Sequence, residues 1–506
     1  MASPFSDPER PKLSFFSRVS GNDVSESAID SSREALISGD GSSASYSVCA
    51  VIISFFFPAL GGLLYGYDIG ATSGATISIE SPTLSGTTWF DLNSVEIGLV
   101  VSGSLYGALI GSVLAFTVAD FLGRRRELIT SSMLYLIGAL LTAFAPNFPI
   151  MVVGRFVFGI GIGLAMHAAP MYIAETAPSE IRGRLISMKE FFIVAGMLLG
   201  YVFSSLYVDM VAGWRFMYAT SSPICLVMGI GMWWLPPSPR WLLLRAIQGN
   251  GSLPEAKEIA ICSLCKLRGQ LGSMSSLEVD AILVELSFVD EANKATLREI
   301  FQGKCRKALM IGAGLVFFQQ VTGQPSVLYY AATILQSAGF SVASDATRVS
   351  ILLGLLKLVM TGVAVLVVDK LGRRPLLIGG VSVMAISLFL LSSYYTLLKD
   401  LPSVAVAALL LYVGCYQLSF GPIGWLMISE IFPLRLRGKG LSIAVLVNFA
   451  SNALVTFAFS PLEALLGTGI LFACFGVIAV ISLVFIFLVI PETKGLTLEE
   501  IEAKIL

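Results

Sequence analysis

Two adjacent glutamines stand in a stretch of chain that is otherwise apolar. Gln319 and Gln320 occur in "GLVFFQQVTGQ", where branched and aromatic side chains precede them. An amide group both donates and accepts hydrogen bonds, and inside an apolar helix it lowers stability unless a partner uses it. The pair therefore indicates a binding site for a ligand rich in hydrogen-bonding groups, while a purely structural role stays open.

A single acid lies deep in the first long apolar stretch. Asp68 stands in "GGLLYGYDIGATSGA", where neighbouring glycines permit the close approach of another backbone. An ionised carboxylate at that depth is costly, so we expect Asp68 either to take up a proton readily or to be paired with a base. A titrating group and a static ion pair are both consistent with this position.

Membrane-spanning helices must position these side chains. The 506 residues are 55% hydrophobic and 13% charged, with a mean hydropathy of +0.81, whereas roughly a quarter of a soluble domain is charged. Apolar runs of about 20 residues recur, the length of a bilayer-crossing helix, and backbone groups in lipid must be satisfied within the helix. We predict an all-α polytopic membrane protein with twelve spans, near residues 48–70, 95–118, 127–146, 149–172, 187–209, 216–236, 308–335, 349–368, 375–397, 403–428, 440–462 and 466–490.

The segments outside these spans divide the chain. Residues 1–47 are polar and rich in serine, with seven acids and four bases, and we expect a disordered tail because a signal peptide would need an apolar core. Residues 237–307 carry ten bases with helical periodicity, which predicts a helical linker. The expected six-helix bundles are then residues 48–236 and 308–490, followed by a tail at 491–506.

The distribution of basic residues predicts the orientation. Twenty-eight of the 33 bases fall in the tails and loops on one side, and only Arg215, Arg348 and Lys399 fall on the other. Because basic residues concentrate on the cytoplasmic side of membrane proteins, both termini are expected in the cytosol.

Three motifs occur twice, at offsets of 249 to 255 residues. The pairs are "DFLGRRRE" (120–127) with "DKLGRRPL" (369–376), "ETAPSEIRGR" (175–184) with "EIFPLRLRGK" (430–439), and "PSPRWLL" (237–243) with "PETKGLT" (491–497). Near-constant offsets indicate duplication of a six-helix unit. Both copies of each motif fall on the predicted cytoplasmic side, so the halves should be parallel repeats about an axis along the membrane normal.

The repeated motifs carry matched acids and bases. These are Asp120, Arg124, Arg125, Glu175 and Arg182 in the first copy, and Asp369, Arg373, Arg374, Glu430 and Arg437 in the second. Such charges can pair between the bundles in one state and separate in another, which would make them a cytoplasmic latch. Anchoring by positive charge alone is the alternative, although it would not require the acids.

The motifs together resemble the sugar porter branch of the major facilitator superfamily. They are "GRRR", "GRRP", "RFVFGIGIG", "PMYIAETAPSEIRGR", "PSPRWLL", "QQVTGQPSVLYY", "GPIGWLMISEIFPLRLRG" and "PETKGLTLEEIE", and they run in family order from about residue 50 to residue 503. The last three are most similar to the plant vacuolar glucose transporter group, also called xylose–proton symporter-like proteins. This resemblance implies the major facilitator fold and transport of a monosaccharide by alternating access, with no cofactor and no enzymatic activity.

The resemblance also implies roles for individual residues. The implied sugar-binding residues are Gln319, Gln320, Gln324, Phe420, Trp425, Asn448 and Asn452. Asn452 could equally join helices, and Tyr329 and Tyr330 resemble an outer gate with helix packing as the alternative. Asp68 matches the proton-coupling position of family symporters and is expected to face Arg155.

Four positions depart from the family pattern. Met197 and Pro325 stand where polar site residues are usual, and Pro237 replaces an acid in "PPSPR". Lys357 replaces an asparagine and could either be a second charge in the cavity or extend toward the membrane surface. The choice among glucose, xylose and fructose therefore cannot be copied from the family.

The resulting expectation is a proton-coupled carrier of a hexose, with glucose first and xylose as an alternative. A facilitative uniporter and a transport-inactive sugar sensor are the rival functions. The expected partners are the monosaccharide and protons, without nucleic acid, and the protein is expected to act as a monomer. The vacuolar membrane is the expected location, with the plasma membrane as the alternative.

Overall fold

The structure is a computed structural model. It describes the backbone of residues 46–494 except 179, 250–251, 270–271, 293–304, 341, 398–400 and 433–436, and the side chains of the same residues except 116–120, 187, 272–274, 285, 287–292, 305, 369, 429 and 437–439. The described part consists of helices, turns and irregular loops, without a β-strand. The all-α class predicted from the sequence is confirmed.

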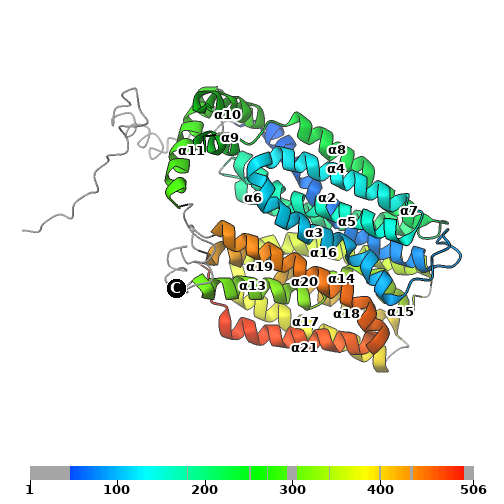
Figure 1. Ribbon diagram of the computed structural model, residues 1–506. Coiled ribbons are helices and arrows are strands. Elements are labelled where there is room, and N and C mark those ends of the chain that lie inside the picture. Colours follow the sequence, from blue (N-terminus) through cyan, green and yellow to red (C-terminus); the bar gives the residue numbers. More distant parts are fainter. Residues whose placement is uncertain are drawn as a thin grey trace, which may run out of the picture. The chain divides into compact units, whose positions relative to one another are not determined.

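Each half of the chain contributes six helical passes (Figure 1). The first half contains α2 (Val48–Glu80), α3 (Ser94–Leu122), α4 (Arg124–Ala143), α5 (Phe148–Thr176), α6 (Arg182–Tyr207), and the consecutive α7 (Gly213–Ala219) and α8 (Ser221–Trp234). The second half contains the broken run α13 (Cys305–Val321), α14 (Gln324–Tyr329) and α15 (Ala331–Ser337), then α16 (Ala343–Leu371), α17 (Arg373–Leu397), α18 (Pro402–Leu418) with α19 (Phe420–Ile431), α20 (Arg437–Leu466) and α21 (Thr468–Val489).

Ten helices in the described residues are long and apolar enough to cross a membrane. The other two passes are α4, whose first turn is the basic "RRRE", and the run α13–α15, which is divided into short pieces. One predicted span was too short, because α2 continues ten residues past position 70 to Glu80. Its last turns contain Thr72, Ser73 and Thr76, which are polar but at most 3% exposed, so they pack against protein rather than lipid.

Three shorter helices form the linker between the halves. They are α9 (Pro239–Ile247), α10 (Leu253–Arg268) and α11 (Gly272–Ala292), and they lie together at one end of the bundle (Figure 1). We call this the linker end and the opposite end the outer end.

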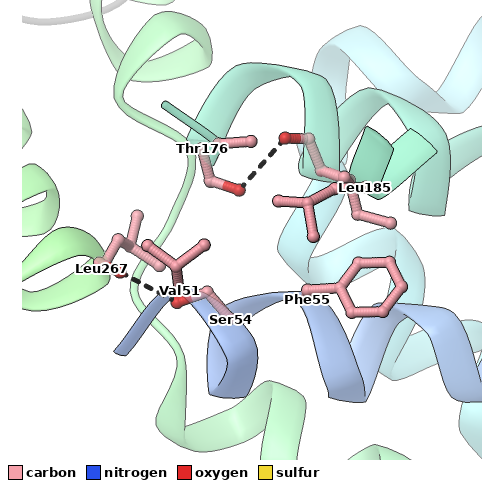
Figure 2. A pocket seen from close by; sticks show the side chains of 8 residues that line it. Val51, Ser54, Phe55, Thr176, Leu185 and Leu267 are labelled. Carbon is pink, nitrogen blue, oxygen red and sulfur yellow. Dashed lines mark hydrogen bonds between the residues drawn. The ribbon is translucent and has the colours of Figure 1, made fainter. Parts of the chain in front are cut away.

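The carboxyl end of α10 is fixed to the first half. Arg268 donates from Nε to the carbonyl of Thr176 (3.0 Å) and from Nη2 to that of Ala177 (3.1 Å), while Ser54 Oγ donates to Leu267 O (3.2 Å). Figure 2 shows the small pocket at this junction, whose volume of about 10 Å³ gives room for no more than one water molecule. The pocket is therefore too small for a sugar.

Glycines allow the helices of the first half to approach closely. A Cβ on Gly66 of α2 would lie 1.8 Å from the carbonyl oxygen of Ile193 in α6, and one on Gly107 of α3 would lie 2.1 Å from that of Phe156 in α5. Close backbone contact through small residues is a usual means of holding membrane helices together. The glycine-rich stretches thus have a packing function.

The two halves meet directly at the outer end. Tyr201 Oη of α6 donates to Leu328 O of α14 (2.7 Å), and the backbone N–H of Ala332 in α15 donates to Ser73 Oγ of α2 (3.0 Å). In addition, Gly98 of α3 packs against the backbone of Phe457 in α20. These outer contacts close the bundle on the side opposite the linker.

Candidate functional site

Two broken passes of the second half position the amide groups. Gly323 adopts a left-handed φ of +88°, and α14 begins directly after it with Pro325 in its first turn. The second break lies at Ser419, between α18 and α19. A break frees backbone groups that a continuous helix would use, and such irregular backbone within a membrane is tolerated where it is buried or lines a cavity.

Gln319 and Gln320 occupy the last turn of α13 and reach two other helices. Gln319 Nε2 donates to the carbonyl of Phe420 at the second break (2.8 Å), and Gln320 Nε2 donates to Asn448 Oδ1 of α20 (2.6 Å). Both glutamine side chains are at most 5% exposed. The structure therefore brings α13, α19 and α20 together around these amides.

Three buried amide atoms in this region have no hydrogen-bond partner among the described residues. They are Gln319 Oε1, Gln320 Oε1 and Gln324 Nε2. Buried polar atoms are nearly always hydrogen-bonded, so an unpartnered group calls for an explanation such as a ligand. Two acceptors and one donor near a helix break form a set that can bind hydroxyl groups.

Aromatic side chains surround the same region. Phe420 is buried with its ring 6.0 Å from that of Tyr416, and the partly buried Trp425 packs against the same cluster. Asn452 lies one turn beyond Asn448 on α20, but its Oδ1 accepts a bond from Thr456 of its own helix (3.1 Å). In this conformation Asn452 therefore makes a local contact, whereas Asn448 contacts the amides.

Tyr329 and Tyr330 are both fully buried near the outer contacts. Tyr330 Oη donates to Thr456 O (3.3 Å), and its ring stacks on Phe459 with centroids 4.6 Å apart. The hydroxyl of Tyr329 has no hydrogen-bond partner in the described part of the chain. Tyr330 thus packs within its own half.

The structure pairs Asp68 of α2 with Arg155 of α5. Arg155 Nη1 donates to Asp68 Oδ1, and both side chains are at most 2% exposed. Ser104 Oγ of α3 donates to Asp68 Oδ2 (2.8 Å), and Arg155 Nε donates to Val100 O (3.0 Å). The guanidinium also lies 5.1 Å from the centroid of the Tyr218 ring. Ser104 was missed by the sequence reasoning, because a serine in an apolar helix gives no signal of its own.

Lys357 lies in the middle of α16 and faces the neighbouring α18. Its Nζ is 6.0 Å from the centroid of the Tyr416 ring, the same ring that neighbours Phe420. No carboxylate of a described residue lies within 4.0 Å of this ammonium group. Lys357 therefore extends toward the aromatic side of the amide region.

The repeated motifs form two matching networks at the linker end. In the first half Arg124 pairs with Glu175 (3.2 Å), which also accepts a bond from Ser238. The corresponding network of the second half has Arg373 paired with Glu430 (3.0 Å) and Thr493 Oγ1 donating to Glu430 Oε2 (2.6 Å). The next arginine of each motif binds a carbonyl, Arg125 that of Trp233 (2.5 Å) and Arg374 that of Phe487 (2.7 Å).

The latch inferred from the sequence would pair these charges between the bundles in one state and separate them in another. In this conformation each of the two ion pairs joins helices of the same half, so the latch stays a prediction. Arg182 begins α6, and its Nε is buried without a hydrogen-bond partner among the described residues. The side chains of Asp120, Asp369 and Arg437 lie outside the described residues.

The two networks are unequal in one contact. Glu492 accepts bonds from the backbone N–H groups of Arg373 (3.1 Å) and Arg374 (3.0 Å), and so caps α17. Burial acts against ionisation of this carboxyl, but backbone N–H bonds outweigh it and lower the pKa of Glu492. Ser238 and Thr493 make equivalent bonds to Glu175 and Glu430, so in the structure Pro237, directly before Ser238, corresponds to Glu492, and α4 has no side-chain cap.

A further buried pair was not anticipated. His167 Nδ1 of α5 lies 2.9 Å from Oε1 of Glu127, a carboxylate that is fully buried in the first turn of α4. The sequence feature that could have indicated this pair is the acid that directly follows three arginines, in "RRRELI".

Comparison with known proteins identifies the architecture. Residues 54–505 match the family described as "Sugar (and other) transporter". The chain is 66% identical over 502 residues to D-xylose-proton symporter-like 2 of Arabidopsis thaliana, with 99% of each chain covered. It is 64% identical over 466 residues to the chloroplastic D-xylose-proton symporter-like 3 of the same plant, covering 91% of this chain and 84% of the relative.

Solved structures of the xylose transporter XylE from E. coli have the same fold. Its inward-open conformation aligns with a TM-score of 0.73 at 31% identity, covering 89% of this chain and 98% of XylE. The proton:xylose symporter XylE bound to 6-bromo-6-deoxy-D-glucose aligns with a TM-score of 0.71 at 32% identity, covering 91% and 100%. The resemblance drawn from the motifs is confirmed: this chain is a membrane protein of the sugar transporter family within the major facilitator superfamily.

Proposed function

We propose that this protein carries a monosaccharide across the membrane by alternating access and couples that movement to a proton. The observation that carries the proposal is the group of unpartnered atoms Gln319 Oε1, Gln320 Oε1 and Gln324 Nε2, buried beside a helix break. The names of the relatives support it, because they are described as D-xylose–proton symporter-like. Of the possible sugars we place glucose first, since XylE was solved with a glucose derivative bound.

In this proposal the amides bind the ring hydroxyl groups. Two hydroxyls donate to the free oxygens of Gln319 and Gln320, and Gln324 Nε2 donates to a third. The rings of Phe420 and Trp425 offer apolar faces to the C–H groups of the sugar, a combination usual in small-molecule sites. Asn448 already holds Gln320 in place and supplies a further polar group at the same site.

The outer contacts and the networks at the linker end support two alternating states. The observed conformation is closed at the outer end by Tyr201, Ser73 and their partners. Opening there would separate the halves near Tyr329 and Tyr330, while the two arginine networks would keep each half rigid at the linker end. We propose that the linker end faces the cytosol, because it carries most of the basic residues.

Proton coupling would act through Asp68. Protonation removes the charge that attracts Arg155, whose remaining partners are backbone carbonyls, the hydroxyl of Ser104 and the Tyr218 ring. The contact between α2 and α5 is weakened when the carboxyl is neutral, so rocking of the halves depends on the proton. In a uniporter the ion pair of Asp68 and Arg155 would be a fixed structural element. Movement of protons together with the sugar therefore distinguishes a proton-coupled carrier from a uniporter.

The location is proposed to be the vacuolar membrane, with the plasma membrane as the alternative. The resemblance of the motifs to the vacuolar glucose transporter group supports this location, and one relative is named as chloroplastic. Fluorescent tagging in plant cells, with markers of all three membranes, tests this assignment directly.

The test of the sugar site is direct binding to purified protein. Radiolabelled glucose, xylose and fructose are offered to the unaltered chain and to Gln319→Ala, Gln320→Ala and the double variant. We expect at least tenfold weaker binding for each single variant, because buried hydrogen bonds to the ligand are lost. Gln248→Ala, an exposed amide of the linker region, is the matched control. Unchanged binding in the double variant would remove the proposed site.

A further inference from the structure

A second cavity lies between the halves at the outer end. Its volume is about 230 Å³. The first half contributes Glu80 from α2 with Ser94 and Ile97 from α3, and the second half contributes Tyr330, Thr333, Ser460, Glu463 and Ala464. The cavity therefore has walls from both halves only while their outer ends are together.

Two carboxylates from different halves line this cavity. Glu80 is the last residue of α2, and Glu463 lies near the end of α20, so the one cavity holds an acid from each half. Glu463 Oε1 accepts a bond from Thr468 Oγ1 (2.9 Å). Thr333 also lines the cavity, and its buried hydroxyl oxygen has no hydrogen-bond partner among the described residues.

No basic residue in the described part of the chain neutralises these acids. Arg215 of α7 donates to the carbonyls of Ala143 (3.0 Å) and Ala145 (2.9 Å), and Arg348 of α16 pairs with Asp345. The other titratable groups near the two acids are the phenols of Tyr330 and Tyr395 and, at the start of α3, Glu96, which accepts a bond from the N–H of Asn93 (2.9 Å). Closure thus brings two like charges together without a cation.

We propose that Glu80 and Glu463 share one proton when the outer end is closed, so that acidity on that side favours closure. Two carboxylates confined in one site cannot both ionise without strong repulsion, and a single proton converts the repulsion into a hydrogen bond. When the outer end opens, the acids separate into water and the proton leaves. This device rests on the proposed alternating access but does not involve Asp68.

The shared proton gives the equilibrium between closed and open outer ends a defined pH dependence. If closure takes up one proton, the ratio of closed to open molecules rises by up to about tenfold for each unit by which the pH falls. In the open form at neutral pH both acids face water and are ionised, so closure without uptake of a proton would bring two like charges together. In an acidic compartment, protonation of the same acids would favour the closed form of the sugar-bound protein.

The test measures the outer distance directly. Spin labels are placed at Val211 and Leu465, which are 64% and 80% exposed on the outer ends of different halves, in a chain whose seven cysteines are replaced by alanine. An Asp68→Asn background prevents that carboxyl from contributing. The short-distance population is expected to grow as the pH falls from 8 to 5, and to be independent of pH in Glu80→Gln/Glu463→Gln. Asp209→Asn, an exposed acid at the same end, is the matched control and should retain the response.

A charge reversal provides an independent check that does not depend on neutral side chains. Glu463→Lys should form an ion pair with Glu80 and stay closed at every pH. Persistence of the full pH response in the double glutamine variant would overturn the proposal, and so would an open outer end in Glu463→Lys. If the distance between the two spin labels changed with neither sugar nor pH, alternating access itself would be refuted. Failure of the shared proton and failure of the proposed function therefore give different results.

Discussion

Removal of one partner from the ion pair between Asp68 and Arg155 should be more damaging than removal of both. Arg155 is 1% exposed, so Asp68→Asn leaves a buried guanidinium without a countercharge. Breaking a buried ion pair in this way costs about 3–5 kcal/mol, whereas replacing both charges is often close to neutral. The hydrogen bonds of Arg155 to Val100 O and Val101 O remain in the variant, so we place the loss at about 3 kcal/mol.

The assay is a double-mutant cycle on the free energy of unfolding in detergent. Asp68→Asn, Arg155→Gln and the double variant are compared, with Arg348→Gln, an exposed base at the outer end, as the control. The double variant should be less destabilised than Asp68→Asn alone, and so at least 1 kcal/mol less than the sum of the single variants, since residues in contact do not act independently. Additive losses would refute the account of the pair as a single electrostatic unit.

Three further predictions concern the caps and the helix contacts. The pKa of Glu492 is lowered in the folded protein, so its cap on α17 is present above the ordinary pKa range of glutamate and is lost as the pH falls through the folded-state pKa. Hydrogen exchange of the Arg373 amide should accelerate as the cap is lost. In Glu492→Gln this exchange should be fast at all pH values. Pro237→Glu should supply the missing cap of α4 and stabilise this helix by about 1 kcal/mol. Hydrogen exchange of the backbone amides in the first turn of α4 should then be slower, and faster exchange would contradict the prediction. Gly66→Ala should prevent folding, measured by size-exclusion chromatography, because its Cβ would lie 1.8 Å from Ile193 O; a normal monodisperse peak would show the contact to be unimportant.

Much of the fold could be predicted because it follows from local composition. Hydropathy and the repeated motifs located the spans, and the duplication implied two similar halves. The end of α2 was missed because Thr72, Ser73 and Thr76 read as polar loop, whereas they are buried against other helices. Hydropathy reports what a side chain is, but it does not report whether lipid or protein surrounds it.

The site was predictable in its residue types and less so in its partners. Gln319 and Gln320 stood out as amides in an apolar helix, yet their contacts with Phe420 and Asn448 depend on how distant helices meet. The pairing of Glu175 with Arg124 likewise depends on how α4 and α5 meet. Glu80 and Glu463 gave no signal, because each stands at the end of a span where an acid is ordinary, and their proximity arises only from closure of the two halves.

Proton-driven uptake in vesicles tests the central claim most directly. Purified protein is reconstituted into liposomes with an enclosed pH indicator, an imposed pH difference and labelled glucose or xylose outside. We predict that sugar accumulates above its external concentration only while the pH difference lasts, that protons move in the same direction as the sugar, and that Asp68→Asn retains sugar exchange without accumulation. Equilibration of sugar to equal concentrations, with no proton movement in the unaltered protein, would contradict the account.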